Sequence, residues 1–251
     1  MAAATLTARL QFLLARPESR ATVGVAFDEL GGPVVAVCGL TGGAGTTTLA
    51  LLLAKLTAEE NGAPVLVTEA RAGGGLALLA GQATPYSLQT LAARAAHGEA
   101  PAGAFAELAP GLRLVATVDR HPRDADAPVG ALIDQARDAH GLVVVDCGTT
   151  WPEDDAILAC ATRRVWVFPA TPAGVATARA TLPSGAATAV AVGRDPYALP
   201  GVRAVRRAVR GRCDRLVLVP YSAEIARGDL SPNGAITHAI TGIAMSLRGG
   251  L

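Results

Sequence analysis

Short valine-rich runs that alternate with helix-length segments are the feature that most constrains how this chain can fold. The runs fall at residues 33–38, 65–69, 112–117, 142–147, 164–169, 188–193 and 215–220. Each has the length of a buried strand, and helical patterns such as residues 49–61 separate most of them. The alternation predicts an α/β fold: a doubly wound, mainly parallel sheet with helices on both faces. Ligands of such sheets bind beyond the carboxyl ends of the strands.

Composition supports one large domain of this kind. Of 251 residues, 51% are hydrophobic and 17% are charged, which suits a sheet covered on both faces and excludes a mainly disordered chain. The formal net charge of +1 gives no whole-molecule field for nucleic acid or an anionic membrane. We expect a domain at 33–251 and a helical extension at 1–32, where leucines recur at helical spacing between residues 5 and 16. The N-terminus does not read as a signal peptide, so a cytoplasmic location is expected.

A glycine-rich turn follows the first predicted strand. The segment GLTGGAGTTTLALLLAKL covers residues 39–56. Its glycines leave the backbone free to curl, so that successive N–H groups and the start of the next helix can point at one phosphate. A strict phosphate-binding loop ends in lysine followed by Ser or Thr, whereas here the last glycine, Gly45, is followed by Thr46 and Thr47.

This turn and three later segments resemble the ParA/MinD family, whose deviant Walker motif reads KGGxGK[ST]T. Residues 65–81 are similar to its second strand and switch I, 143–150 to its Walker B and switch II, and 216–228 to the Pro-Tyr turn near adenine. The last segment most resembles the CpaE/TadZ branch, which places pilus or secretion machinery. The resemblance implies a P-loop NTPase-like fold and gives Thr47 and Asp146 the Mg²⁺ side of the site. The nucleotide contacts that it implies are Gly42, Gly43, Ala44, Gly45, Thr46, Thr47, Thr48, Asp146, Pro220 and Tyr221.

The departures from the family pattern concern charge. The signature lysine falls on Thr41 and the P-loop lysine on Thr46, and a chain whose single lysine is Lys55 among 22 basic residues would be expected to use arginine where charge matters. In switch I, the two aspartates are replaced by Glu69 and Arg71. The asparagine that often recognises adenine is replaced by Gly193, followed by Arg194.

Because phosphoryl transfer depends on positioning and charge neutralisation, we expect negligible ATP hydrolysis. Binding of ATP or ADP with Mg²⁺ is expected to be weak or absent, although the backbone cradle and Asp146 remain. The chain is therefore interpreted as a catalytically degenerate positioning or scaffold factor, CpaE/TadZ-like, which acts on protein partners of a localisation, secretion or pilus apparatus and forms a homodimer. The alternative is an active ATPase that cycles on DNA or membrane. A ligase or kinase on the same fold is a third and weaker reading.

Two further segments have competing interpretations. Six arginines lie between 202 and 215, and they are interpreted as a solvated helix face in preference to a binding site for an anion such as DNA phosphate. Residues 235–248 carry an apolar stripe, which favours a helix packed on the sheet or at a dimer interface over a membrane-binding helix, because basic residues are few. Membrane or nucleic-acid contact is thus expected to be weak.

The remaining reactive side chains point to no second site. The four histidines are scattered, the four cysteines form no metal-binding pattern and are expected to be free thiols, and the acidic residues 153–155 are expected to start a helix.

Overall fold

The computed structural model describes residues 31–61, 63–71, 73, 75–99, 103–119, 128–149, 156–193 and 202–248. The predicted N-terminal helix, the acidic residues 153–155 and Arg194 lie outside these ranges. The domain boundary at 32 therefore stays a prediction.

One eight-stranded sheet organises the fold, in the order β3-β4-β2-β5-β1-β6-β7-β8. Every neighbouring pair is parallel except β3 and β4. The strands are β1 (Val34–Gly39), β2 (Val65–Glu69), β3 (Ala106–Ala109), β4 (Leu112–Val115), β5 (Leu142–Thr149), β6 (Arg163–Pro169), β7 (Ala186–Val192) and β8 (Cys213–Val219). This arrangement confirms the predicted α/β class.

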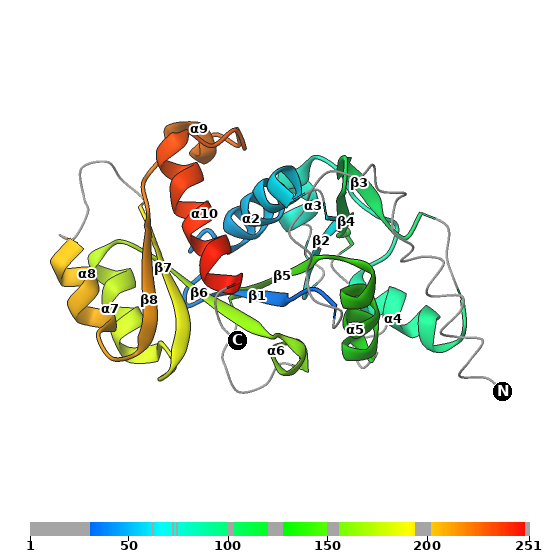
Figure 1. The fold of residues 1–251 in the computed structure, drawn as a ribbon, viewed down its shortest axis with the longest axis horizontal. Helices are drawn as coiled ribbons and strands as arrows, with labels where there is room; N and C mark the ends of the chain where they lie inside the picture. The colour runs from blue at the N-terminus through cyan, green and yellow to red at the C-terminus, as the bar shows by residue number, and fades with distance from the viewer. Residues whose placement is uncertain are drawn as a thin grey trace.

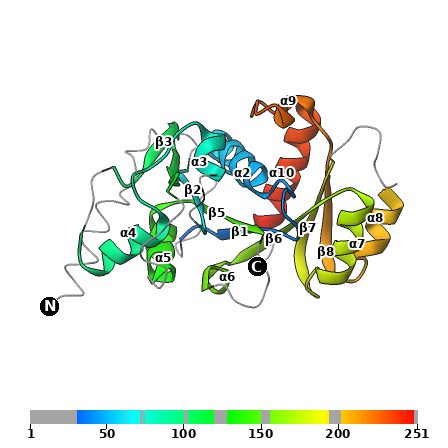
Figure 2. The same cartoon turned by 180° about the vertical axis from the view of Figure 1, so that it is seen from behind.

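Helices cover both faces of the sheet (Figures 1 and 2). One face carries α2 (Thr46–Asn61), α3 (Gly75–Ala80) and α10 (Gly234–Arg248). The other carries α4 (Leu88–Ala96), α5 (Val129–Ala139), α6 (Ala156–Cys160), α7 (Pro172–Thr181) and α8 (Val202–Val209). The short helix α9 (Ala223–Ala226) follows β8 and leads to α10.

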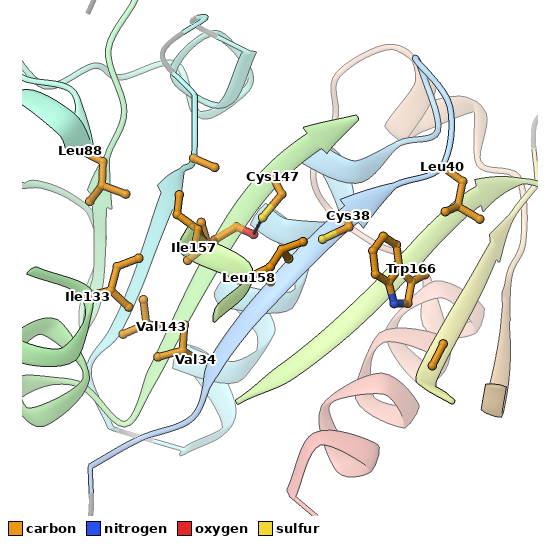
Figure 3. Packing of buried hydrophobic residues seen from close by; sticks show 14 of the residues in the cluster. Val34, Cys38, Leu40, Leu88, Ile133, Val143, Cys147, Ile157, Leu158 and Trp166 are labelled. Atoms are coloured by element: carbon orange, nitrogen blue, oxygen red, sulfur yellow. Dashed lines mark hydrogen bonds between the residues drawn. The ribbon is translucent and has the colours of Figure 1, made fainter. Parts of the chain in front are cut away.

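The central strands are buried on both faces, which explains why they read as continuous valine runs. All six residues of β1 are buried, and so are all five of β2. Figure 3 shows the layer under α5 and α6, where Val34, Val143 and Ile133 pack together. None of the four cysteines forms a disulfide; Cys38 and Cys147 are buried in this layer, as the sequence suggested, whereas Cys160 and Cys213 are only partly buried.

Helix α10 confirms the packed reading of the last apolar stripe. It packs on α2 and β8, and its stripe residues Ile236, Ile240, Ile243 and Leu247 are at most 6% exposed. Such burial leaves the stripe unavailable to lipid. Within the described ranges, none of the helices combines the length and the hydropathy that a bilayer span requires.

Three local features were not predicted. The short strand β3 lies in an Ala-rich stretch whose sequence shows no strand pattern. It is recognised as a strand only from its antiparallel pairing with β4. Helix α2 begins at Thr46, three residues before the start of the apolar pattern at 49. Helix α8 ends at Val209, so Arg210 lies in the following turn. Arg215 lies on β8, in agreement with the strand predicted at 215–220.

Candidate functional site

The glycine loop lies where the parallel-sheet rule predicts, between the carboxyl end of β1 and the start of α2. Gly43 and Gly45 have φ of +67° and +93°, a region that side chains with a Cβ rarely adopt. A Cβ on Gly42 or Gly43 would meet nothing within 4 Å, so this part of the loop faces open space. The loop thus keeps the open, curled backbone that a phosphate group requires.

The side chains of the loop do not add to this cradle. Ala44 is 1% exposed and Thr46 is 5% exposed. The Thr46 hydroxyl lies so near the backbone of β1 that a Cβ on Gly39 would be 2.5 Å from its Oγ1. The Thr41 hydroxyl is buried without a hydrogen-bond partner. No basic residue occurs from Thr41 to Thr48, so the loop offers N–H groups and hydroxyls only.

Asp146 and Thr47 are brought together as expected. The Thr47 hydroxyl donates to the Asp146 carboxylate, and the Gly148 N–H donates to its Oδ1 at 3.0 Å. Burial raises the pKa of Asp146 above its ordinary value, while these two hydrogen bonds act in the opposite direction. The pair offers one carboxylate and one hydroxyl, which are oxygen donors of the type that Mg²⁺ prefers. Within the described ranges, no three His, Cys, Asp or Glu residues group as metal ligands, so phosphate oxygens would have to complete such a site.

The two residues that the resemblance assigns to switch I, Glu69 and Arg71, lie in different surroundings. Glu69 is 5% exposed and pairs in register with Asp146 across β2 and β5. Its carboxylate accepts a hydrogen bond at 3.2 Å from the N–H of Thr117. Arg71 is exposed. Neither residue reproduces the carboxylate that the family resemblance would place next to the attacking water.

A pocket of about 480 Å³ adjoins the loop, and we call it the carboxyl-end pocket. Gly45 and Thr48 form one side of it, and Pro220 and Tyr221 form the other. Leu52 and Ile240 contribute to its apolar lining, and none of its sixteen lining residues is charged. Its size and apolar character suit the base of a nucleotide. The sequence predicted the loop and the Pro-Tyr turn, but it did not predict the contributions of Leu79, Ile225 and α10.

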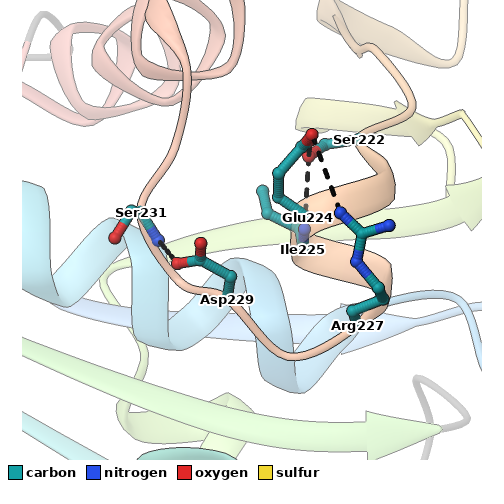
Figure 4. A network of polar contacts seen from close by, with 6 residues as sticks. All are labelled: Ser222, Glu224, Ile225, Arg227, Asp229 and Ser231. Atoms are coloured by element: carbon teal, nitrogen blue, oxygen red, sulfur yellow. Dashed lines mark hydrogen bonds and ion pairs between the residues drawn. The ribbon is translucent and has the colours of Figure 1, made fainter.

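A local polar network holds the α9 side of this pocket (Figure 4). The Ser222 hydroxyl accepts from the N–H of Ile225 at 3.2 Å and donates to Glu224 at 2.7 Å. Glu224 also lies 4.0 Å from the Arg227 guanidinium, and the Asp229 carboxylate accepts from the N–H of Ser231. Four-residue α9 therefore depends on its caps, and the wall of the pocket depends on α9.

Gly193, where the resemblance implies an adenine-recognising asparagine, packs directly against the Pro-Tyr turn. A Cβ at Gly193 would lie 2.6 Å from the backbone N of Tyr221, and the Gly193 N–H donates to Val219 O at 2.8 Å. The Pro-Tyr turn therefore packs directly on residue 193. No side chain fits there, so adenine recognition by an amide at this position is excluded.

The fold is that of known ParA and MinD proteins. A ParA family ATPase from Chlorobium tepidum superposes with a TM-score of 0.68 at 14% identity, covering 86% of this chain and 99% of that one. MinD of Pyrococcus horikoshii, solved with Mg-ADP, has a TM-score of 0.63 at 16% identity over 87% and 96% of the two chains. The MinC:MinD complex of Aquifex aeolicus has a TM-score of 0.64 at 16% identity, and the match covers 88% of this chain and 97% of that one. No protein-family model matches the sequence, and neither does any curated protein.

Proposed function

We propose that this chain is a ParA/MinD-type protein whose nucleotide site has lost its cations, and that it acts as a positioning or scaffold factor through protein contacts. The observation that carries the proposal is the glycine loop: its backbone stays open for phosphate, while its two lysine positions are threonines and Thr46 is turned against β1. A bound triphosphate would meet only backbone and hydroxyl donors there. Without charge neutralisation, the rate of phosphoryl transfer falls by several powers of ten.

The residues present fit Mg²⁺ and a nucleotide better than they fit hydrolysis. Thr47 and Asp146 would hold the metal, the 42–48 backbone would hold phosphates, and the carboxyl-end pocket would hold the base. When bound, Mg²⁺ neutralises phosphate charge. The protein's own residues would supply orientation only, and affinity for ATP or ADP is therefore weak. The structural likeness to a MinD solved with Mg-ADP supports this ligand class.

The process served is proposed from the sequence resemblance. The 216–228 segment is similar to the CpaE/TadZ branch, and this favours placement of a pilus or secretion apparatus. A protein partner is also supported by the likeness to MinD in a MinC:MinD complex.

Phosphate release under saturating MgATP tests the proposal. We expect turnover indistinguishable from that of the Asp146→Ala variant. Steady-state hydrolysis that Asp146→Ala abolishes would reject the degenerate reading. It would support the alternative of an active ATPase, which the intact Thr47–Asp146 pair favours, and the DNA and vesicle assays would then test cycling.

The same proposal includes a homodimer that forms without nucleotide. A site that lacks the lysine reaching across the dimer cannot use ATP as the bridge. We expect the mass from light scattering to be unchanged by MgATP. A mass that doubles only on addition of MgATP would contradict this part of the proposal.

A further inference from the structure

The near-zero net charge conceals a strong separation of charge along the sheet. Within the described part of residues 31–149 there are five basic and nine acidic residues. Within the described part of residues 156–215 there are nine arginines and one acidic residue, Asp214. The β6–β8 part of the sheet with α7 and α8 is therefore strongly positive, in contrast to the part that carries the glycine loop.

Part of this charge surrounds a pocket of about 730 Å³ at the amino ends of β6, β7 and β8, which we call the amino-end pocket. Arg163 and Arg164 border it from the start of β6, and Arg215 borders it from β8. It opens at the opposite end of the strands from the carboxyl-end pocket. No sequence pattern predicts that residues 163 and 164 lie near the arginines of 202–215, because about forty residues separate the two segments.

Some of these guanidiniums are held in place by main-chain carbonyls. Arg164 donates through Nη2 to Leu158 O at 2.7 Å, and Arg212 donates through Nη1 to Leu182 O at 2.8 Å, next to the pocket residue Pro183. In the described ranges neither of these arginines forms an ion pair with an acidic side chain. Each keeps further N–H donors for an anion, and the fixed geometry lowers the entropy lost on binding.

The pocket is not purely basic. Its floor includes the buried residues Leu158 and Trp166, and the end of α10 adds Met245, which is 62% exposed. Four further arginines, at positions 203, 206, 207 and 210, are exposed on α8 and in the turn after it. This helix packs on β8, whose Arg215 borders the pocket. A ligand no larger than the pocket would leave these unmatched. An extended chain with acidic and apolar side chains would match both the rim and the floor.

We infer that the amino-end pocket and the adjoining α8 arginines are a docking surface for an acidic segment of a partner protein. Nucleic acid fits less well because Trp166, 2% exposed, cannot stack on a base. The inference rests on the proposed function only in taking the partner to be a protein. It names the chemistry of that partner.

Fluorescence anisotropy on the full chain tests this surface. The probe is a labelled peptide in which glutamate alternates with leucine, and the control probe carries glutamine for glutamate. We expect the acidic probe to bind in a salt-dependent manner and the control probe not to bind. Arg164→Glu with Arg215→Glu should weaken binding about tenfold or more.

A matched pair of variants separates the surface from general charge. Arg94→Glu with Arg71→Glu makes the same change in net charge elsewhere on the molecule and should alter affinity less than about twofold. Met245→Ser should weaken binding, whereas Leu78→Ser, at a similarly exposed residue of α3, should not. Thermal melts of each variant confirm folding, and Arg164→Gln with Arg215→Gln provides a milder substitution if the charge reversal does not fold.

Three results would overturn the inference: no binding of the acidic probe at low salt, equal binding by all variants, or tighter binding of a DNA duplex that the Arg164 and Arg215 variants lose. The last result would assign the surface to nucleic acid. Phosphate release measured on the same preparation keeps the two proposals apart. If ATP is hydrolysed and the peptide binds, only the proposal of a degenerate site is rejected. If ATP is not hydrolysed and the peptide does not bind, only the docking surface is rejected.

Discussion

The two ends of the sheet differ in what they offer an anion. At the carboxyl end, the loop of residues 41–48 has a curled, open backbone and no basic residue. At the amino end of β6–β8, arginines line a pocket that has no glycine loop. Phosphoryl transfer requires an ordered backbone cradle and cations at one place. Here the curled loop and the arginine-lined pocket are separated by the length of the strands, and this separation is the basis for the proposed loss of hydrolysis.

Helix α10 links the two ends. Ile236 and Ile240 line the carboxyl-end pocket, while Met245 and Ser246 line the amino-end pocket. The first two are buried in the core, and Met245 is exposed. Substitutions along one helix can therefore test how differently the two ends depend on packing.

The largest effect is expected for Ile240→Ala. Ile240 is fully buried, and removal of its side chain leaves a cavity under the carboxyl-end pocket. We expect a loss of about 2–5 kcal/mol in the free energy of unfolding, measured by urea denaturation. Met245→Ala on the same helix should change it by less than about 0.5 kcal/mol. Similar small effects at both positions would mean that α10 is peripheral and would reopen its reading as a membrane-binding helix.

Restoring charge to the loop is the next largest effect. Thr46→Lys with Thr41→Lys should raise ATP affinity roughly tenfold to a hundredfold, because a charged hydrogen bond contributes about 1.5–3 kcal/mol. Isothermal titration with MgATP measures it. The control adds two lysines at the exposed positions Leu78 and Val118, which have no part in the loop. An equal gain in the control would show that only net charge had changed, and no gain in either would show that the loop backbone does not fit phosphate.

A smaller effect is expected on thermal stability and its pH dependence when Asp146 is replaced. Burial raises its pKa above the ordinary 3.8, so the folded state favours the protonated form and loses stability as pH rises through the folded-state pKa. Asp146→Asn keeps an acceptor for the Gly148 N–H and removes this penalty. We expect a higher Tm than wild type at pH 7, by about 2–4 °C for each kcal/mol relieved.

The difference should shrink as pH falls and disappear well below 3.8, where the wild-type carboxyl is protonated in both states. Asp134→Asn, at an exposed position of α5, serves as the control for the loss of one carboxylate from the chain. If the gain in Tm does not change with pH, the ionisation of Asp146 is not its cause.

The sequence predicted well what depends on short, regular patterns. The central strands are buried on both faces, so their valine runs mark them directly, and the curled loop requires glycine at positions such as Gly43 and Gly45. Features that arise from distant segments were not predictable. The contact that excludes a side chain at Gly193 comes from the Tyr221 backbone, and the amino-end pocket joins Arg164 to Arg215. Neither relation leaves a periodic signal in the chain.

The smallest effect is expected in binding to DNA and lipid. The arginines of α8 and the amino-end pocket give a local positive field, so weak attraction to DNA at low salt is expected. Each phosphate neutralised adds to the salt dependence, and within the described ranges this surface lacks an exposed aromatic residue to stack on bases. The stripe of α10 is buried, which removes the apolar face that lipid binding needs.

At about physiological ionic strength, where the Debye length is roughly 8 Å, we expect neither a DNA mobility shift nor co-sedimentation with anionic vesicles. Reversal of Arg203, Arg207 and Arg210 should then change little. If binding persists at this ionic strength and is lost on that reversal or on deletion of residues 235–251, the amino end supplies a nucleic-acid or membrane surface, and the active-cycling alternative replaces the scaffold.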